Sequence, residues 1–274
     1  MMRYTIRYVS LLAGMLTVFS SCEHKDLCFD HEAHAPKSDV HVKAVYEKEW
    51  EHTCEGGPDW EQYPAWESRF GMEYHELCPD APDGLRVQVY NEDGTNNILN
   101  VAPEGDIVRM RPGEHSLLLY NNDTEYIVFD DMNSFASAKA TTRTRTRASY
   151  AGNPYMENTV ENTVNAPDML YGNYMENYTA ERKIEADELP VTMHPLVFTY
   201  LVRYEFSHGL EYVALARGAL AGMAGAVWLN SGRTSEEAAT ILYDCSVEDF
   251  GTQACVQSFG IPDYPNEHYT TRTE

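Results

Sequence analysis

The stretch VFTYLVRYEF at residues 197–206 has the cleanest two-residue period in the chain. One set of alternate positions is wholly aromatic or aliphatic, namely Phe198, Tyr200, Val202, Tyr204 and Phe206. Successive side chains of a strand point to opposite faces, so this alternation predicts a β-strand with one apolar face.

Shorter segments with the same character occur on both sides of this stretch. The segment LRVQVY at 85–90 alternates and is followed by the turn sequence NEDG at 91–94. Further strands are predicted at 40–46, 98–101, 107–110, 115–120, 126–129, 212–216, 226–229, 239–242 and 256–259. Short strands with turns about every eight to twelve residues are typical of sandwiches and barrels, so the chain is predicted to be all-β.

Three stretches lack this alternation. Residues 51–82 are rich in proline, glycine and acidic residues and are predicted to be an irregular insertion. Residues 136–188 contain TTRTRTR at 141–147 and are predicted to be an irregular polar connector, with an exposed protease site as the alternative interpretation of the arginines. The small residues at 218–225 are interpreted as a crossover that leads into the strand at 226–229.

The first residues, MMRYTIRYVSLLAGMLTVFSSC at 1–22, have the pattern of a secretory leader. Arg3 and Arg7 precede an apolar run that is too short to span a bilayer of about 30 Å. Because Cys22 follows two small residues, the segment resembles a bacterial lipoprotein signal, in which the cysteine is acylated and becomes the first residue. The prediction is therefore a leader at 1–21, lipidation of Cys22 and a polar tether at 22–38. The alternative is an ordinary secreted protein with a chance cysteine.

The chain is strongly acidic, with 43 Asp and Glu residues against 20 Lys and Arg residues and a net charge of −23. A surface of this sign repels phosphate backbones, which argues against nucleic-acid binding. It suits a solvated protein at a cell surface.

The remaining cysteines are Cys28, Cys54, Cys78, Cys245 and Cys255. In an oxidising compartment, Cys54 with Cys78 and Cys245 with Cys255 are the local pairing choices. Five is an odd number, and the sequence does not settle which pairs form.

Two clusters are candidates for ligand binding. His24, Cys28, His31 and His34, with His41 beyond them, have side chains that bind zinc, and a charged spacer is the alternative. Trp50, Trp60 and Trp66 could stack on sugar rings, and loop packing is the alternative. We find no nucleophile elbow, metalloprotease motif, phosphate loop or EF-hand loop, so the sequence predicts neither an enzyme nor a cofactor.

Five segments, taken in order, resemble the fimbrillin-like surface lipoproteins of Bacteroidales. They are SSCEHKDLCFDH (20–31), RPGEHSLLLYNNDTE (111–125), NAPDMLYG (165–172), MHPLVFTYLVRYEF (193–206) and GALAGMAGAVWLNSG (218–232). The resemblance covers most of the chain after Cys22. Within that group it is strongest to a branch known only as a domain of unknown function.

The resemblance implies two tandem transthyretin-like β-sandwich domains, which we expect at 39–135 and 189–274. It implies an outer-membrane, lipid-anchored structural or adhesion protein that pairs with other fimbrial subunits by strand exchange. Such proteins continue beyond the segment that corresponds to 255–265, so we expect either a truncated second domain or one that lacks its final strands. The rival interpretation is a surface lipoprotein that binds a glycan or metal and has no assembly role.

Overall fold

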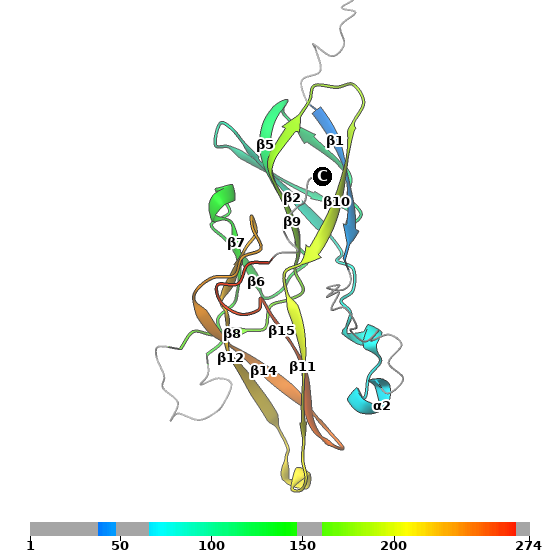
Figure 1. Cartoon of the computed structure of the whole chain (residues 1–274), viewed down its shortest axis with the longest axis vertical. Coiled ribbons are helices and arrows are strands. Elements are labelled where there is room, and N and C mark those ends of the chain that lie inside the picture. Colours follow the sequence, from blue (N-terminus) through cyan, green and yellow to red (C-terminus); the bar gives the residue numbers. More distant parts are fainter. Residues whose placement is uncertain (1–37, 48–65, 147–160, 267–274) are drawn as a thin grey trace, which may run out of the picture. The chain divides into compact units, whose positions relative to one another are not determined.

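The computed structural model describes residues 38–47, 66–146 and 161–266, which form three β-sheets (Figure 1). The largest sheet has seven strands. In spatial order they are β3 (Asn96–Val101), β2 (Leu85–Asn91), β5 (Gly113–Asn121), β9 (Tyr171–Ala180), β10 (Asp187–Pro195), β1 (Ser38–Tyr46) and β4 (Ile107–Met110). Neighbouring strands are antiparallel except β1 and β10, which run parallel.

The seven-stranded sheet curls so that its two ends approach each other. Its edge strands, β3 and β4, are joined only by residues 102–106, which can span at most about 20 Å. Backbone groups of this link also bond β1, through Val42 N to Asp106 O at 3.1 Å and Ala44 N to Glu104 O at 2.9 Å. The curled sheet encloses a buried cluster that includes Val40, Val42, Val87, Val108, Leu117, Tyr171, Val191 and Met193.

A second sheet contains β11 (Phe198–Glu205), β15 (Gly251–Ser258), β14 (Ala238–Glu248) and β12 (Ala216–Ala224). The short strand β8 (Thr163–Asn165) pairs in parallel with β14. Strand β14 pairs with β15 only over Ser246–Glu248, next to the turn that joins them. A cluster of Val164, Met223, Ala239, Ile241, Tyr243 and Val256 is buried here.

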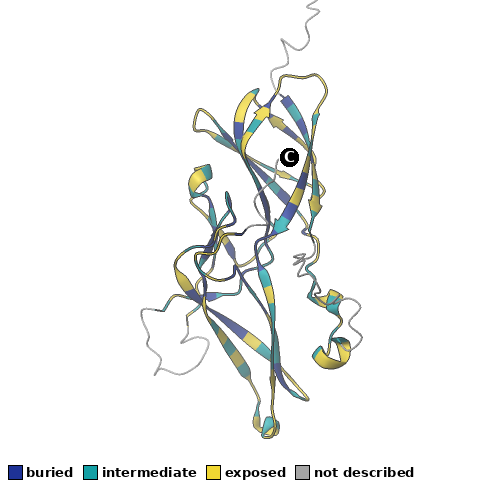
Figure 2. Ribbon diagram, viewed as in Figure 1, coloured by how far each residue is buried: buried dark blue, intermediate teal, exposed yellow. Residues whose placement is uncertain are grey.

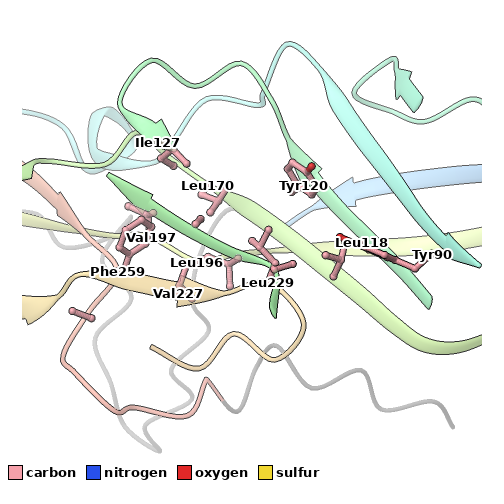
Figure 3. Packing of buried hydrophobic residues seen from close by; sticks show 13 residues of the cluster. Tyr90, Leu118, Tyr120, Ile127, Leu170, Leu196, Val197, Val227, Leu229 and Phe259 are labelled. Carbon is pink, nitrogen blue, oxygen red and sulfur yellow. The ribbon is translucent and has the colours of Figure 1, made fainter. Parts of the chain in front are cut away.

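A third sheet, with the order β13 (Ala226–Trp228), β7 (Lys139–Thr142) and β6 (Ile127–Asp130), lies against the other two. Figure 3 shows the cluster that joins them, which contains Tyr120 and Leu118 of the largest sheet together with Val227 and Leu229. Leu196 and Val197, the only residues between β10 and β11, are 1% and 2% exposed and lie in the same cluster. A two-residue link with a bend at Val197 therefore leads from the first sheet through the shared core into the second.

The helices are short: α2 (Trp66–Phe70), η1 (Tyr74–Leu77), η2 (Phe135–Ser137) and η3 (Leu210–Tyr212). None of the residues in α2 is buried, as Figure 2 shows. Across the described ranges, no helix combines the length and apolar character needed to cross a bilayer.

The predicted all-β class is confirmed, but three local predictions were wrong. The expected connector contains β7, β8, β9 and the start of β10, and β9 is an interior strand of the largest sheet. The strand expected at 212–216 is the helix η3 and a loop, and β12 begins only at Ala216.

The third wrong prediction is the small-residue crossover, which is the strand β12. A Cβ on Gly218 would lie 2.1 Å from the ring of Tyr243 on the paired strand, so the missing side chain makes room for that ring. The strand has a register shift between Leu220 and Met223, where Gly222 has φ +77°. The domain boundaries at 39–135 and 189–274 stay predictions.

Candidate functional site: the open edge of β11

Strand β11 is at the edge of its sheet. One side pairs with β15 along its whole length, from Phe198 opposite Ser258 to Glu205 opposite Gly251. Among the described residues, no strand pairs with the other side. An edge of this kind presents a row of backbone donors and acceptors that can pair with a strand from another chain.

On its paired side, β11 lies very close to the backbone of β15. A Cβ on Gly251 would lie 1.9 Å from the carbonyl oxygen of Tyr204, so only glycine allows this approach of β15. Just beyond the strand, Phe206 N donates to Phe250 O at 2.9 Å. At the other end, Leu196 N donates to Leu170 O at 2.8 Å. The strand is thus fixed from one side and both ends, which leaves its outer edge accessible.

The apolar face predicted for this segment extends beyond the core. Tyr200 and Val202 pack partly against the buried cluster of the second sheet. Farther along, Tyr204 is 54% exposed and Phe206 is 41% exposed. A strand added here would cover large apolar side chains as well as satisfy backbone groups.

The polar side chains on the strand are tied back to this sheet. The guanidinium of Arg203 lies over the ring of Phe250, with its central carbon 3.5 Å from the ring centroid. Its Nε also donates to Glu205 Oε1 at 3.2 Å. Both contacts of the Arg203 cation are therefore with residues of its own sheet or of the turn beside it.

Three other edge strands, β12, β3 and β4, are less suited to pairing. Strand β12 is broken by its register shift at Leu220 and Met223, and bulges of this kind discourage edge pairing. Strand β3 carries three asparagines and a single exposed large apolar residue, Ile98. Strand β4 has only four residues and is next to the link that bonds β1.

Most of the site residues predicted from the sequence lie outside the described residues. These are Cys22, His24, Cys28, His31, His34, Trp50, Cys54 and Trp60. The lipidation, the Cys54–Cys78 pairing and the tether metal site therefore stay predictions. His41, the last residue of the histidine series, belongs to β1 rather than to the tether.

Two predicted residues can be placed. Trp66 is in α2, where its ring centroid lies 4.4 Å from that of Phe70 and 5.0 Å from that of Tyr74. These contacts favour loop packing over sugar stacking for Trp66. Cys78 follows η1 and lines a hollow of about 470 Å³ together with Tyr171 and Cys255. Within the described part of the chain, no group of three or more His, Cys, Asp or Glu side chains is arranged to hold a metal ion.

The cysteines of the second sheet are poorly suited to reaction. Cys245 and Cys255 carry free thiols. Burial raises the pKa of both, and the nearby carboxylate of Asp244 raises the pKa of Cys245 further. Since the thiolate is the reactive form, both side chains are largely protonated at neutral pH.

Sequence reasoning missed a second hollow, of about 540 Å³, which Lys139, Trp228, Arg233 and Asp263 help to line. These residues come from separate parts of the sequence, and no motif connects them. The signal that could have drawn attention to it is a tryptophan in a short strand followed closely by arginine and acidic residues.

The fold is that of an all-β protein built from several sheets, and a solved candidate adhesin from Bacteroides ovatus shares this fold. Residues 65–244 match the family model described as "Domain of unknown function (DUF5119)". This match spans more than half of the chain, so the protein belongs to that family. The expected membership of a fimbrillin-like branch known only as a domain of unknown function is confirmed.

The chain is also similar to individual proteins. A candidate fimbrium anchoring subunit, Fim4B of Bacteroides ovatus, is 27% identical over 178 residues, which are 63% of this chain and 50% of that protein. The chain thus spans half the length of this curated relative. A crystal structure of a candidate adhesin from Bacteroides ovatus has a TM-score of 0.60 and 21% identity, covering 89% of this chain and 75% of the other. The fimbrial anchor protein Mfa2 from Porphyromonas gingivalis has a TM-score of 0.47 and 11% identity, covering 84% and 75%. The similarity to the candidate adhesin shows a shared fold.

Proposed function

We propose that the protein is a lipid-anchored structural or adhesive subunit of a fimbria-like assembly at the cell surface, and that it has no catalytic activity. The observation that carries this proposal is the open edge of β11 in a chain related to a fimbrium anchoring subunit. In this proposal, another subunit adds a strand beside β11 and covers Tyr204 and Phe206.

The chemistry of the edge supports pairing between strands. Strand β11 has eight residues and no proline, so each of its residues carries both a backbone donor and a backbone acceptor. Alternate side chains on a strand point to one face, so an added strand would place its own apolar residues beside Tyr204. Main-chain bonds supply affinity in such pairing, and side-chain pockets supply specificity.

Docking is tested by placing a charge on the exposed edge. Tyr204→Lys puts a cation where an apolar partner would pack, a substitution that blocks edge pairing in natural sheets. We expect this variant to lose the complex with fimbrial subunits of the producing cell, measured by size-exclusion chromatography and by ladders on unboiled denaturing gels. Tyr212→Lys is the matched control, because Tyr212 is 84% exposed in η3 and lies outside the strand. Equal complex formation by both variants would argue against β11 as the docking edge.

Lipid anchoring is tested separately. Cys22→Ser is expected to abolish labelling by radioactive palmitate and to leave a soluble or an unprocessed product, because the serine hydroxyl cannot form the thioether. Cys245→Ser is the control, since it removes a thiol on a described strand and leaves Cys22 intact. Palmitate incorporation that persists in Cys22→Ser would refute the anchor and leave the docking proposal standing.

A further inference from the structure

The hollow of about 540 Å³ lies over β13 and β7 of the three-stranded sheet. Its size falls within the range of small-molecule sites, about 300–1,000 Å³. Strand β11 contributes no residue to its lining, so whatever binds there is independent of the strand docking proposed above. The side chains that line it combine one aromatic plate with closely spaced donors and acceptors.

The aromatic plate is Trp228, at the end of β13. The register places it opposite Lys139, whose Nζ is 5.7 Å from the ring centroid. Asp130 and Asp131 hold that ammonium group at 3.5 and 3.2 Å. The indole is only half-buried, and its Nε1 makes no hydrogen bond to the described residues. An indole fixed in this way offers a flat apolar surface and an unused donor to a ligand.

The polar wall opposite is Arg233 with Asp263. Arg233 Nε donates to Asp263 Oδ1 at 3.1 Å, and its Nη2 donates to the same oxygen. These two bonds use one carboxylate oxygen and one edge of the guanidinium, although arginine has five N–H donors and a carboxylate has two oxygens. The second oxygen and the remaining donors stay available for bonds to a ligand.

This wall is fixed by the backbone around it. Asp263 has φ +54°, a conformation that is costly for a residue other than glycine, and its N–H donates to Ser235 O at 3.0 Å. Thr234 Oγ1 donates to Ile261 O at 2.7 Å and accepts from Tyr264 N at 2.8 Å. Trp228 N donates to Arg233 O at 2.8 Å, which ties the aromatic plate to the polar wall. The site is thus organised before a ligand arrives.

The charges in the hollow nearly offset one another. Lys139 and Arg233 face Asp263, Glu236 and Glu237, in a chain whose net charge is −23. An anionic ligand would meet carboxylates, and a cationic one would compete with cations already paired to them. A neutral ligand with an apolar face and several hydroxyl groups fits this arrangement best.

We infer that this hollow binds a neutral pyranose sugar. The C–H groups on one face of the ring would stack on Trp228. Neighbouring hydroxyls would donate to Asp263 and accept from Arg233, which is the pairing that two adjacent hydroxyls can make with a guanidinium and a carboxylate. The protein would then hold a glycan at one place and a fimbrial strand at another.

The test uses the folded full-length mature protein and four uncharged probes: methyl α-mannopyranoside, methyl β-galactopyranoside, cellobiose and diacetylchitobiose. Titration calorimetry is expected to show saturable binding of at least one probe, and Trp228→Ala is expected to weaken that binding about tenfold or more. Asp263→Asn keeps the shape and tolerates positive φ but removes the charge, and should weaken binding severalfold. Trp66→Ala is the matched control, because Trp66 does not line the hollow.

Three outcomes would overturn the inference. The first is that none of the four probes binds at millimolar concentration. The second is that Trp228→Ala and Asp263→Asn both bind as the unsubstituted protein does, while circular dichroism shows all of them folded. The third is binding confined to sulfated or uronic-acid sugars, which would show that the site selects an anion.

Discussion

The hydroxyl of Tyr120 on β5 donates to Oε1 of Gln88 on the neighbouring strand β2, at 3.0 Å and out of contact with water. Gln88 is 1% exposed, and its Nε2 donates to Met132 O at 2.7 Å. The same carbonyl accepts from Tyr90 at 3.0 Å. A small polar network is therefore buried between the largest sheet and the segment that follows β6.

This network predicts a specific stability loss. Gln88→Leu leaves the Tyr120 hydroxyl and the Met132 carbonyl with fewer partners, so we expect the free energy of unfolding to fall by about 1–3 kcal/mol. Urea denaturation of Gln88→Leu, Tyr120→Phe and the double variant measures the coupling. The double variant should lose less than the sum of the single losses. Strict additivity would mean that the two side chains do not act together.

Asp168 anchors the start of β6. Its Oδ2 accepts backbone N–H groups of Glu125, Tyr126 and Ile127, from a segment more than forty positions away. We expect Asp168→Ala to lower the free energy of unfolding by about 2–3 kcal/mol, because bonds to a charged acceptor are strong. Asp168→Asn keeps a neutral acceptor and should lose about half as much. Hydrogen exchange at Ile127 should accelerate in both variants, and unchanged exchange would contradict the anchoring role.

Gly105 lies in the link that bonds β1. It has φ +101°, and a Cβ there would lie 2.0 Å from Val42 O, an atom of the buried part of β1. Gly105→Ala should therefore destabilise the fold by about 3 kcal/mol or more, or prevent folding. Gly94→Ala is the control, because Gly94 has φ +79° with open space around it and should cost only about 1–2 kcal/mol. Comparable melting temperatures for the two variants would refute the close approach of this link to β1.

Because the phenol of Tyr171 is buried, we expect the protein to lose stability at alkaline pH. Tyr171 is 1% exposed, and burial raises its pKa from 10.0 to about 12, with further increases from the charges of Cys78, Asp80 and Glu47. The folded protein holds the phenol proton more tightly than the unfolded chain. The resulting stabilisation is thus complete below pH 10 and is lost as the pH rises towards 12.

The measurement compares the protein with Tyr171→Phe, which cannot ionise at this position. Urea denaturation is carried out at several pH values between 9 and 12. The stability advantage of the tyrosine form should shrink across the upper part of this range. An advantage that stays constant would show that the pKa of Tyr171 is not raised by folding.

The sequence predicted strands wherever the side chains alternate, and β11 and β2 are the best examples. It missed β9 because polar residues occupy interior positions: Asn173 is 3% exposed and donates through Nδ2 to Thr192 O at 2.7 Å. That partner belongs to another strand, so a local pattern cannot reveal the hydrogen bond that the Asn173 Nδ2 makes. It missed β12 for a related reason, because the glycine that admits Tyr243 is explained only by pairing with β14.

The candidate sites also depend on contacts between residues far apart in the sequence, which a local pattern does not show. The apolar face of β11 was visible in its alternation, but its position at the edge depends on which strands pair with it. The hollow of about 540 Å³ is lined by Lys139 of β7, Trp228 of β13 and Asp263 near the C-terminal end of the described chain. Proximity among such distant positions is set by the packing of whole sheets.

The short link of two residues between β10 and β11 has a mechanical consequence. Strand β1 is parallel to β10 over seven residue pairs, and β1 is the first strand of the described residues. A pull that enters at the N-terminal end of β1 and leaves through β11 draws these two strands past each other lengthwise. All the hydrogen bonds between them then share the tension at once, instead of opening one by one as in a zipper, and this geometry is the one that best resists a pull along the strands.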